Sequence, residues 1–358
     1  MLFLLIACLK SPLTLVESTP TDLKVDDVNV PNAATLWVEL FDKAERSIDI
    51  GTFYISPSPK KDALDPVWRS LENASLRGVK IRVLVDKKFS SKYPDPLDEL
   101  RTWKNTEVRL SDYQDSVMHA KYFIVDNQEA FVGSHNFDYR ALEHIFELGY
   151  HIRDPELVKS IQDIYETDWS DSPLNATSHI RSNTRYQIVA SPPHKLPNTV
   201  KHDLPAIKGL IEGARRSVNV QLLSYTNFDY AQEYWYILDD ALINAVKRGV
   251  SVELLVSDWS LTGHKGKSLS KLESEGVAVK YVTVPEHPNG PIPYARTIHS
   301  KILVVDDRHC WLGSSNWSHD YFYKSRNVGI ILSSKRECRI LFKRFQDVYQ
   351  SKWSQTFP

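Results

Sequence analysis

The stretch that decides the fold occurs twice, as His119-Ala-Lys121-Tyr-Phe-Ile-Val-Asp126 in the first half and His299-Ser-Lys301-Ile-Leu-Val-Val-Asp306 in the second. Each copy is followed by a Gly-Ser-x-Asn segment, at Gly133–Asn136 and Gly313–Asn316. Every matched position recurs 180 residues later. A long pattern repeated at one constant spacing indicates a duplicated domain rather than a short-period repeat.

The duplication extends beyond these motifs. Three further pairs of segments keep their order and nearly their spacing: Ala44–Ile50 with Ala214–Val220, Arg77–Val85 with Arg248–Val256, and Tyr165–Trp169 with Tyr349–Trp353. The chain has 358 residues, which is enough for two domains. We expect a leader over 1–14, a first lobe over 15–178 and a second lobe over 179–358. The Ser-, Asn- and Pro-rich stretch 171–201 is the expected linker.

Each half reads as an alternation of helices and strands. In each half one helix ends at an Arg-Gly pair, at Gly78 or Gly249, where glycine suits the position after a helix. The other expected helices lie at 36–46, 155–169, 204–216 and 335–353, and the clearest strands at 79–85 and 250–256. The alternation predicts an α/β fold of two tandem, pseudo-symmetric lobes. Each lobe has a mixed or largely parallel sheet flanked by helices, with the site at their interface.

The repeated motif places chemistry at a strand end. A His and a Lys two residues apart on a strand point to the same face. The Gly-Ser-x-Asn segment that follows can form a turn that offers polar groups to the same place. The resulting substrate-binding candidates are Ser134, Asn136, Ser314 and Asn316. If the halves pack with pseudo-two-fold symmetry, the two motifs line one pocket suited to a phosphate group.

The catalytic candidates from the motifs are His119, Lys121, His299 and Lys301. Two ammonium groups stabilise charge on the non-bridging oxygens of a phosphodiester as it reacts. One neutral imidazole attacks phosphorus, and the other, protonated, donates to the leaving oxygen. This chemistry requires no metal and no cofactor, and the two lysines oppose binding of a divalent cation.

Asp126 and Asp306 end the two motifs. Their odd separation from Lys121 and Lys301 puts them on the opposite strand face, away from the pocket. We therefore assign them structural roles, either in turn formation or in pairing across the lobes.

Composition limits the class of protein. The chain has 44 Lys and Arg against 45 Asp and Glu, so its formal net charge is −1. This balance excludes a general basic field for coating nucleic acid, and any anionic substrate must be held by a local cluster.

The N-terminus suggests an address outside the cytoplasm. Met1–Leu9 is an apolar run that is too short to span a bilayer and resembles the core of a secretory signal, although it lacks a positively charged start. Leu5–Cys8 also fits the pattern before a lipidated cysteine. An alternative start codon and a buried first strand remain open. We expect a secreted, periplasmic lipoprotein or lysosome-like location.

The cysteines and glycosylation sequons leave the compartment open. Cys310 and Cys338 are free to pair, but a reduced state is equally consistent with the sequence. Asn73 and Asn175 begin glycosylation sequons, which matter only in a eukaryotic secretory pathway.

At these motifs the chain resembles the phospholipase D superfamily, whose duplicated signature is His-x-Lys-x4-Asp followed by Gly-Ser-x-Asn. Leu15–Pro20, Ser224-Tyr225, Pro291–Arg296 and Gly313–Ser318 are most similar to its animal lysosomal branch, which includes poxvirus homologues. The resemblance covers residue 15 to the C-terminus. It implies an acid-active 5′-to-3′ exonuclease on single-stranded nucleic acid that works through a phosphohistidine intermediate.

The resemblance leaves alternatives. One is a phospholipase D or transphosphatidylase that acts on phospholipid headgroups near a membrane. The other is a non-catalytic phosphate-binding protein, which the two intact motifs oppose. The chain is expected as a monomer or a homodimer.

The family also carries a glutamate after the first Gly-Ser-x-Asn segment, and Glu147 stands at this place, 28 residues after His119. The symmetric residue in the second half is Asn327. We expect the Glu147 carboxylate beside His119, where it fixes the tautomer and stabilises the cation. On that basis His119 is the nucleophile and His299 the general acid; the reverse assignment stays open.

Several other residues are weaker candidates. His135, inside the first Gly-Ser-x-Asn segment, lines the pocket or its rim. Glu143 and His144 read as ordinary helix-surface residues. The aromatic residues that either stack on bases or pack in the core and rim are Tyr54, Trp259, Tyr294, Trp317 and Tyr321.

Overall fold

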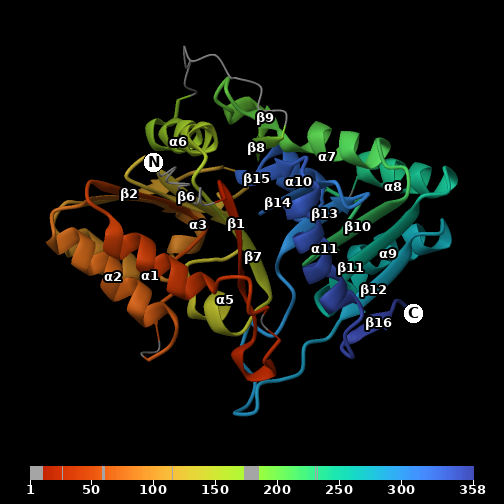
Figure 1. Cartoon of the computed structure of the whole chain (residues 1–358), viewed down its shortest axis with the longest axis horizontal. Coiled ribbons are helices and arrows are strands. Elements are labelled where there is room, and N and C mark those ends of the chain that lie inside the picture. Colours follow the sequence, from red (N-terminus) through yellow and green to blue (C-terminus); the bar gives the residue numbers. More distant parts are fainter. Residues whose placement is uncertain are drawn as a thin grey trace, which may run out of the picture.

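The computed structural model describes residues 11–25, 27–58, 61–114, 116–172, 185–229, 231 and 233–358 (Figure 1). Most of the expected leader lies outside these residues, as do Cys8, Asn175 and the expected boundary between 178 and 179. Leu13 and Thr14, which the expected leader includes, belong to the first strand, β1 (Leu13–Ser18).

The first lobe is a seven-stranded sheet in the order β1-β7-β6-β5-β2-β3-β4. Only the β2–β3 and β3–β4 pairs are parallel. Its other strands are β2 (Ser47–Thr52), β3 (Lys80–Asp86), β4 (Thr106–Ser111), β5 (Lys121–Val125), β6 (Glu129–Gly133) and β7 (Glu147–Ile152). Its helices are α1 (Ala33–Lys43), α2 (Leu64–Leu76), α3 (Lys87–Ser90), α4 (Pro94–Thr102), α5 (Tyr139–Glu143) and α6 (Pro155–Ser170), with a 3-10 turn at Thr21–Leu23.

The second lobe is a nine-stranded sheet in the order β16-β12-β11-β10-β13-β14-β15-β8-β9. Its strands are β8 (Tyr186–Ser191), β9 (Lys201–His202), β10 (Ser217–Leu222), β11 (Ser251–Ser257), β12 (Ala278–Val282), β13 (Lys301–Val305), β14 (His309–Gly313), β15 (Asn327–Leu332) and β16 (Ser354–Thr356). Its helices are α7 (Asp203–Glu212), α8 (Ile237–Lys247), α9 (Gly263–Ser274), α10 (His319–Tyr323) and α11 (Lys335–Tyr349), with 3-10 turns at Pro193–Lys195 and Asp258–Ser260. Two mixed sheets flanked by helices confirm the predicted fold class.

The linker was predicted too long. Strand β8 lies within the expected linker 171–201 and pairs antiparallel with β15 along its whole length. Its sequence, Tyr-Gln-Ile-Val-Ala-Ser, is apolar enough to fill an inner strand position, and four of its last five residues are almost completely buried. The Ser- and Pro-rich residues on either side concealed this strand.

The two glycines of the Arg-Gly pairs end their helices as predicted. Gly78 follows α2 with φ of 95°, and Gly249 follows α8 with φ of 81°. Residues with a Cβ rarely adopt this backbone conformation, so glycine lets the chain leave the helix and turn directly into β3 or β11.

The two lobes share one apolar core. This shared cluster includes Tyr150 and Ile152 on β7 and Ile330 and Leu332 on β15. Each lobe also has an apolar cluster of its own on the outer side of its sheet. The central strands β5 and β13 are therefore covered on both faces, which explains their unbroken apolar runs.

A disulfide joins Cys310 on β14 to Cys338 on α11, with their Cα atoms 5.6 Å apart. Disulfides form and persist mainly in oxidising compartments, which agrees with the general part of the expected location. Among the residues that the structure describes, no helix has the length and apolar character to cross a membrane.

Candidate active site

Pairing of backbone segments across the lobes brings the two repeated motifs together. The His119 N–H donates to the Arg326 carbonyl at 2.8 Å, just before β15 begins. In the symmetric contact, the His299 N–H donates to the Phe146 carbonyl at 2.9 Å, just before β7 begins. The start of each motif therefore lies next to the beginning of a strand of the opposite lobe, β15 for the first motif and β7 for the second.

Both motifs contribute to one buried, positively charged site. Each lysine ammonium donates to the carbonyl of the histidine in its own motif, Lys121 to His119 and Lys301 to His299. Each ammonium therefore lies beside the backbone of the histidine in its own motif. The four side chains are buried, and the lysine charges of both lobes act on both imidazoles.

The Asn327 amide sets the tautomer of His119. His119 Nδ1 lies 3.2 Å from Asn327 Oδ1. The Asn327 Nδ2 group donates to the Tyr321 carbonyl at 2.8 Å and to Ser191 Oγ at 3.3 Å. Asn327 Oδ1 also accepts from Ser314 Oγ at 3.0 Å. A flipped amide would turn its oxygen onto a carbonyl, so Oδ1 must face His119. His119 Nδ1 then carries the proton and Nε2 keeps a free lone pair.

The Glu147 carboxylate contacts His299, not His119. Glu147 Oε1 lies 2.8 Å from His299 Nδ1, and Glu147 is almost completely buried. The expectation of a carboxylate beside His119 is therefore wrong. It assumed contacts within one lobe, whereas the pairing between Phe146 and Ile298 carries the start of β7 into the opposite lobe.

Burial and the lysines shift the protonation of the site. Burial, followed by the two lysine charges, lowers the pKa of His119 and of His299 well below the usual value. Burial also lowers the pKa of Lys301 to about 7 and that of Lys121 well below normal. Burial raises the pKa of Glu147 to about 7. Two buried ammonium groups lack enough opposing negative charge, and a phosphodiester would supply it.

Three of the four Ser and Asn side chains of the Gly-Ser-x-Asn segments accept backbone N–H groups next to the site. Ser134 Oγ accepts the Leu148 N–H at 3.2 Å, and Ser314 Oγ accepts the Val328 N–H at 3.2 Å. The serines thus tie each turn to β7 or β15, and Ser314 also orients Asn327. Asn316 Oδ1 accepts the Ser224 N–H at 3.4 Å. Asn136 Oδ1 is buried and has no hydrogen-bond partner among the described residues.

Asp126 and Asp306 lie outside the site and hold turns within their own lobes. Both have φ of 54° at the turn between β5 and β6 or between β13 and β14. The backbone N–H groups that donate to these two carboxylates belong to Glu45, Arg46, Ser47, Arg215, Arg216 and Ser217. Their contacts are those of the turn-forming role and not of pairing across the lobes.

The weaker candidates separate by environment. His135 is 1% exposed and packs against Phe131 at 5.4 Å, so it is not on the rim. Burial lowers its pKa to about 4, and the charges of Glu147, His299 and Lys301 also act on it, so it lies beside the site. The Tyr321 ring meets the His119 ring edge-on at 4.9 Å. Trp317 is fully buried, whereas Tyr294 is 77% exposed.

The remaining weaker candidates differ in exposure and contacts. The Tyr54 hydroxyl donates to Asp138 at 3.0 Å, and Trp259 is partly exposed. Glu143, like His144, is half-buried. The His144 carbonyl accepts the N–H of Arg296 from the second lobe. His144 therefore lies at the boundary between the lobes, and its reading as a helix-surface residue is wrong.

Sequence reasoning missed a buried ion pair beside the site, Arg326 with Asp168. The symmetric counterpart of Arg326 is Phe146, so the duplication carried no signal for it. Within the described ranges, no three or more His, Cys, Asp or Glu side chains are grouped to hold a metal ion.

Comparisons with known proteins agree with this geometry. The family described as "Cardiolipin synthase, PLD-like domain" matches residues 37–169 and 207–353. The 5'-3' exonuclease PLD4 of Mus musculus is 29% identical over 398 residues, covering 96% of this chain and 78% of the relative. The 5'-3' exonuclease PLD3 of Xenopus laevis is 28% identical, covering 96% and 80%. Phospholipase D Z of Dictyostelium discoideum is 25% identical, covering 98% and 91%.

A solved structure shares the same fold. Phosphatidylserine synthase of Haemophilus influenzae superposes with a TM-score of 0.65 at 14% identity, covering 90% of this chain and 85% of that chain. The family match spans most of both lobes, each of which holds one motif at the shared site. The chain therefore belongs to the phospholipase D superfamily and is a phosphodiesterase with a duplicated PLD-like domain.

Proposed function

We propose that this phosphodiesterase is a metal-independent 5′-to-3′ exonuclease on single-stranded nucleic acid, with His119 as the nucleophile and His299 as the general acid. The substrate class is supported by the exonuclease relatives, which match 96% of the chain. The observation that carries the mechanism is the unequal pairing of the two imidazoles: His119 with an amide and His299 with a carboxylate.

An amide suits the nucleophile. Asn327 accepts the Nδ1 proton of His119 but carries no charge, so it raises the pKa of His119 less than burial and the two lysine charges lower it. His119 therefore stays neutral, with the Nε2 lone pair free to attack phosphorus. This reason replaces the expected carboxylate beside His119 and leads to the same assignment.

A carboxylate suits the general acid. Burial raises the pKa of Glu147 to about 7, so the Glu147–His299 pair keeps a proton up to about that pH. In the first step the bond from His119 Nε2 to phosphorus forms and the bond from phosphorus to the leaving oxygen breaks. The proton of the pair passes to that oxygen.

Water completes the cycle. His299 accepts a proton from the water that attacks phosphorus, the bond from His119 Nε2 to phosphorus breaks, and neutral His119 is restored. Lys121 and Lys301 stabilise the non-bridging oxygens in both steps. We assign orientation of His299 to Glu147 and orientation of His119 to Asn327, which Ser314 holds. We assign substrate contacts to Asn136 and Asn316, whereas Ser134 holds its turn against β7.

A second candidate activity is phospholipid cleavage. It is favoured by the similarity to Phospholipase D Z, which covers 98% of this chain and 91% of that relative. Both activities would use the same histidines and differ in what lies beyond the phosphate.

The experiment compares substrates and ends. The purified full-length chain is incubated with oligonucleotides labelled at the 5′ or the 3′ end, and separately with phosphatidylcholine vesicles, each with and without EDTA. We expect stepwise release from the 5′ end that EDTA does not reduce. Headgroup release without oligonucleotide shortening would reject the nuclease assignment, and loss of activity in EDTA that a divalent metal restores would reject the metal-independent mechanism.

A further inference from the structure

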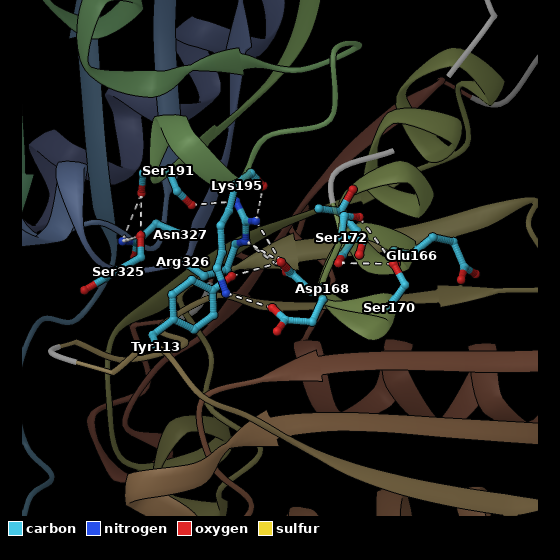
Figure 2. A network of polar contacts seen from close by, with 12 residues as sticks. Tyr113, Glu166, Asp168, Ser170, Ser172, Ser191, Lys195, Ser325, Arg326 and Asn327 are labelled. Atoms are coloured by element: carbon cyan, nitrogen blue, oxygen red, sulfur yellow. Dashed lines mark hydrogen bonds and ion pairs between the residues drawn. The ribbon is translucent and has the colours of Figure 1, made fainter. Parts of the chain in front are cut away.

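A buried ion pair between Arg326 and Asp168 joins the two lobes next to Asn327, the residue that contacts His119 (Figure 2). Arg326 immediately precedes Asn327, and its guanidinium binds both carboxylate oxygens of Asp168 on α6 at 2.7 to 3.0 Å. The same guanidinium donates to the carbonyls of Ser191 at 2.7 Å and Lys195 at 2.6 Å. The Arg326 and Asp168 side chains are 0% and 1% exposed.

Arg326 is connected to His119 by two routes. Its carbonyl accepts the His119 N–H at 2.8 Å, and its own N–H donates to the Val117 carbonyl at 3.1 Å, so its backbone is paired with the segment that carries His119 into β5. Its guanidinium also holds the Ser191 carbonyl, and Ser191 Oγ accepts from the Asn327 amide at 3.3 Å. Asn327 in turn faces His119 Nδ1.

The opposite half shows that the fold does not need this ion pair. There Phe146 precedes Glu147 as Arg326 precedes Asn327, and Phe146 packs against Trp353 at 6.1 Å. A buried ion pair loses hydration that an apolar contact does not lose, and apolar replacements are often equally stable. Its presence behind only one histidine therefore points to that histidine.

We infer that Asp168 and Arg326 are positioning residues for the nucleophile. Their ion pair holds Ser191 and Asn327 so that the amide oxygen keeps His119 in the tautomer protonated at Nδ1. This inference rests on the proposed function, in which Nε2 of His119 attacks phosphorus.

The first test replaces Asp168 with Asn (Asp168→Asn). It keeps the shape of the side chain but leaves the guanidinium without its carboxylate. We expect kcat to fall by about 10- to 100-fold with KM changed by less than about threefold, because small displacements of a reacting group act on the chemical step. The matched control is Asp49→Asn. Asp49 pairs with Arg82, which also binds Glu166 on α6 and contacts neither Asn327 nor His119. The control should retain kcat.

A second variant separates positioning from stability. The double replacement Arg326→Met with Asp168→Leu restores an apolar contact like that in the opposite half. Positioning predicts that Tm returns toward the wild-type value while kcat remains low. A purely structural role predicts that kcat recovers together with Tm, and this outcome would overturn the inference.

The decisive readout is the tautomer itself, from the ¹⁵N chemical shifts of His119, assigned by comparison with His119→Gln. The wild type should show protonation at Nδ1, and Asp168→Asn should show a mixture with Nε2. An unchanged tautomer in Asp168→Asn would overturn the inference. A changed tautomer with unchanged kcat would support the positioning role and reject His119 as the nucleophile.

Discussion

The two lobes bring their motifs into the site by equivalent backbone contacts but orient their histidines with different chemistry. The first lobe supplies Phe146 and Glu147 to the opposite motif, whereas the second supplies Arg326 and Asn327. The shared backbone brings two imidazoles and two ammonium groups to one site. The orienting residues are unequal, because His119 contacts a neutral amide and His299 contacts a carboxylate. Symmetry thus builds the phosphate site, and the departure from symmetry is the basis on which we propose His299 as the acid and His119 as the nucleophile.

Removing each imidazole in turn should have the largest effect, and it tests the different roles proposed for the two histidines. His119→Ala and His299→Ala should each lower kcat on an oligonucleotide on the order of 10⁴-fold, because each removes a group that acts in the chemical step. With a p-nitrophenyl leaving group, which needs no proton, His299→Ala should regain a burst of product and His119→Ala should not. A burst from His119→Ala alone would reverse the assignment.

Exchanging the orienting residues should exchange the roles. Glu147→Gln should lower kcat by about 10³-fold, because the amide still accepts from His299 but cannot retain the proton. Asn327→Asp should raise the pKa of His119, so activity on the acid side is lost at a higher pH than in the wild type. In the double variant the phosphohistidine should move from His119 to His299. Mass spectrometry of acid-labile phosphopeptides identifies the residue, and an intermediate that stays on His119 would contradict this explanation.

The lobes also differ in covalent structure. Removing this difference should change the stability of the protein without changing its catalysis. Cys310 and Cys338 form a disulfide, whereas the matching buried residues in the first lobe are Ala130 and Val158. Replacing both cysteines with Ala should lower the free energy of unfolding by about 3 kcal/mol, from the loop that the disulfide closes. Denaturant titration measures this change, and the pH dependence of kcat should stay that of the wild type. A shifted pH profile would mean that the disulfide also shapes the site.

The smallest expected effect is the pH dependence of the wild type. Burial raises the pKa of Glu147 and lowers that of Lys301, each to about 7. Above pH 7 the Glu147–His299 pair loses its proton and Lys301 loses its charge, so kcat/KM should fall by about tenfold per pH unit or more. At low pH, protonation of His119 removes the nucleophile and activity falls again. A profile that is flat from pH 6 to pH 9 would exclude this account.

The duplication, the α/β class and the residues that meet at the site all follow from the amino-acid sequence alone. These rest on local rules: a period of two places His119 with Lys121 and His299 with Lys301, and glycines after Arg77 and Arg248 end helices. The odd spacing likewise removed Asp126 and Asp306 from the pocket. None of these predictions depends on which lobe contacts which.

The contacts between the two lobes could not be predicted from the sequence and are seen only in the folded chain. From the sequence we predicted that Glu147 lies beside His119 and that the residues of β8 belong to a linker. Nothing in the sequence indicated the ion pair between Arg326 and Asp168. Each of these depends on pairing between segments far apart in the chain, such as β8 with β15 or Phe146 with Ile298. Proton affinity also depends on the folded chain, because burial, followed by charges from both lobes, shifts the pKa of Glu147 and of both histidines. Local spacing carries no information about which charges a folded chain brings together.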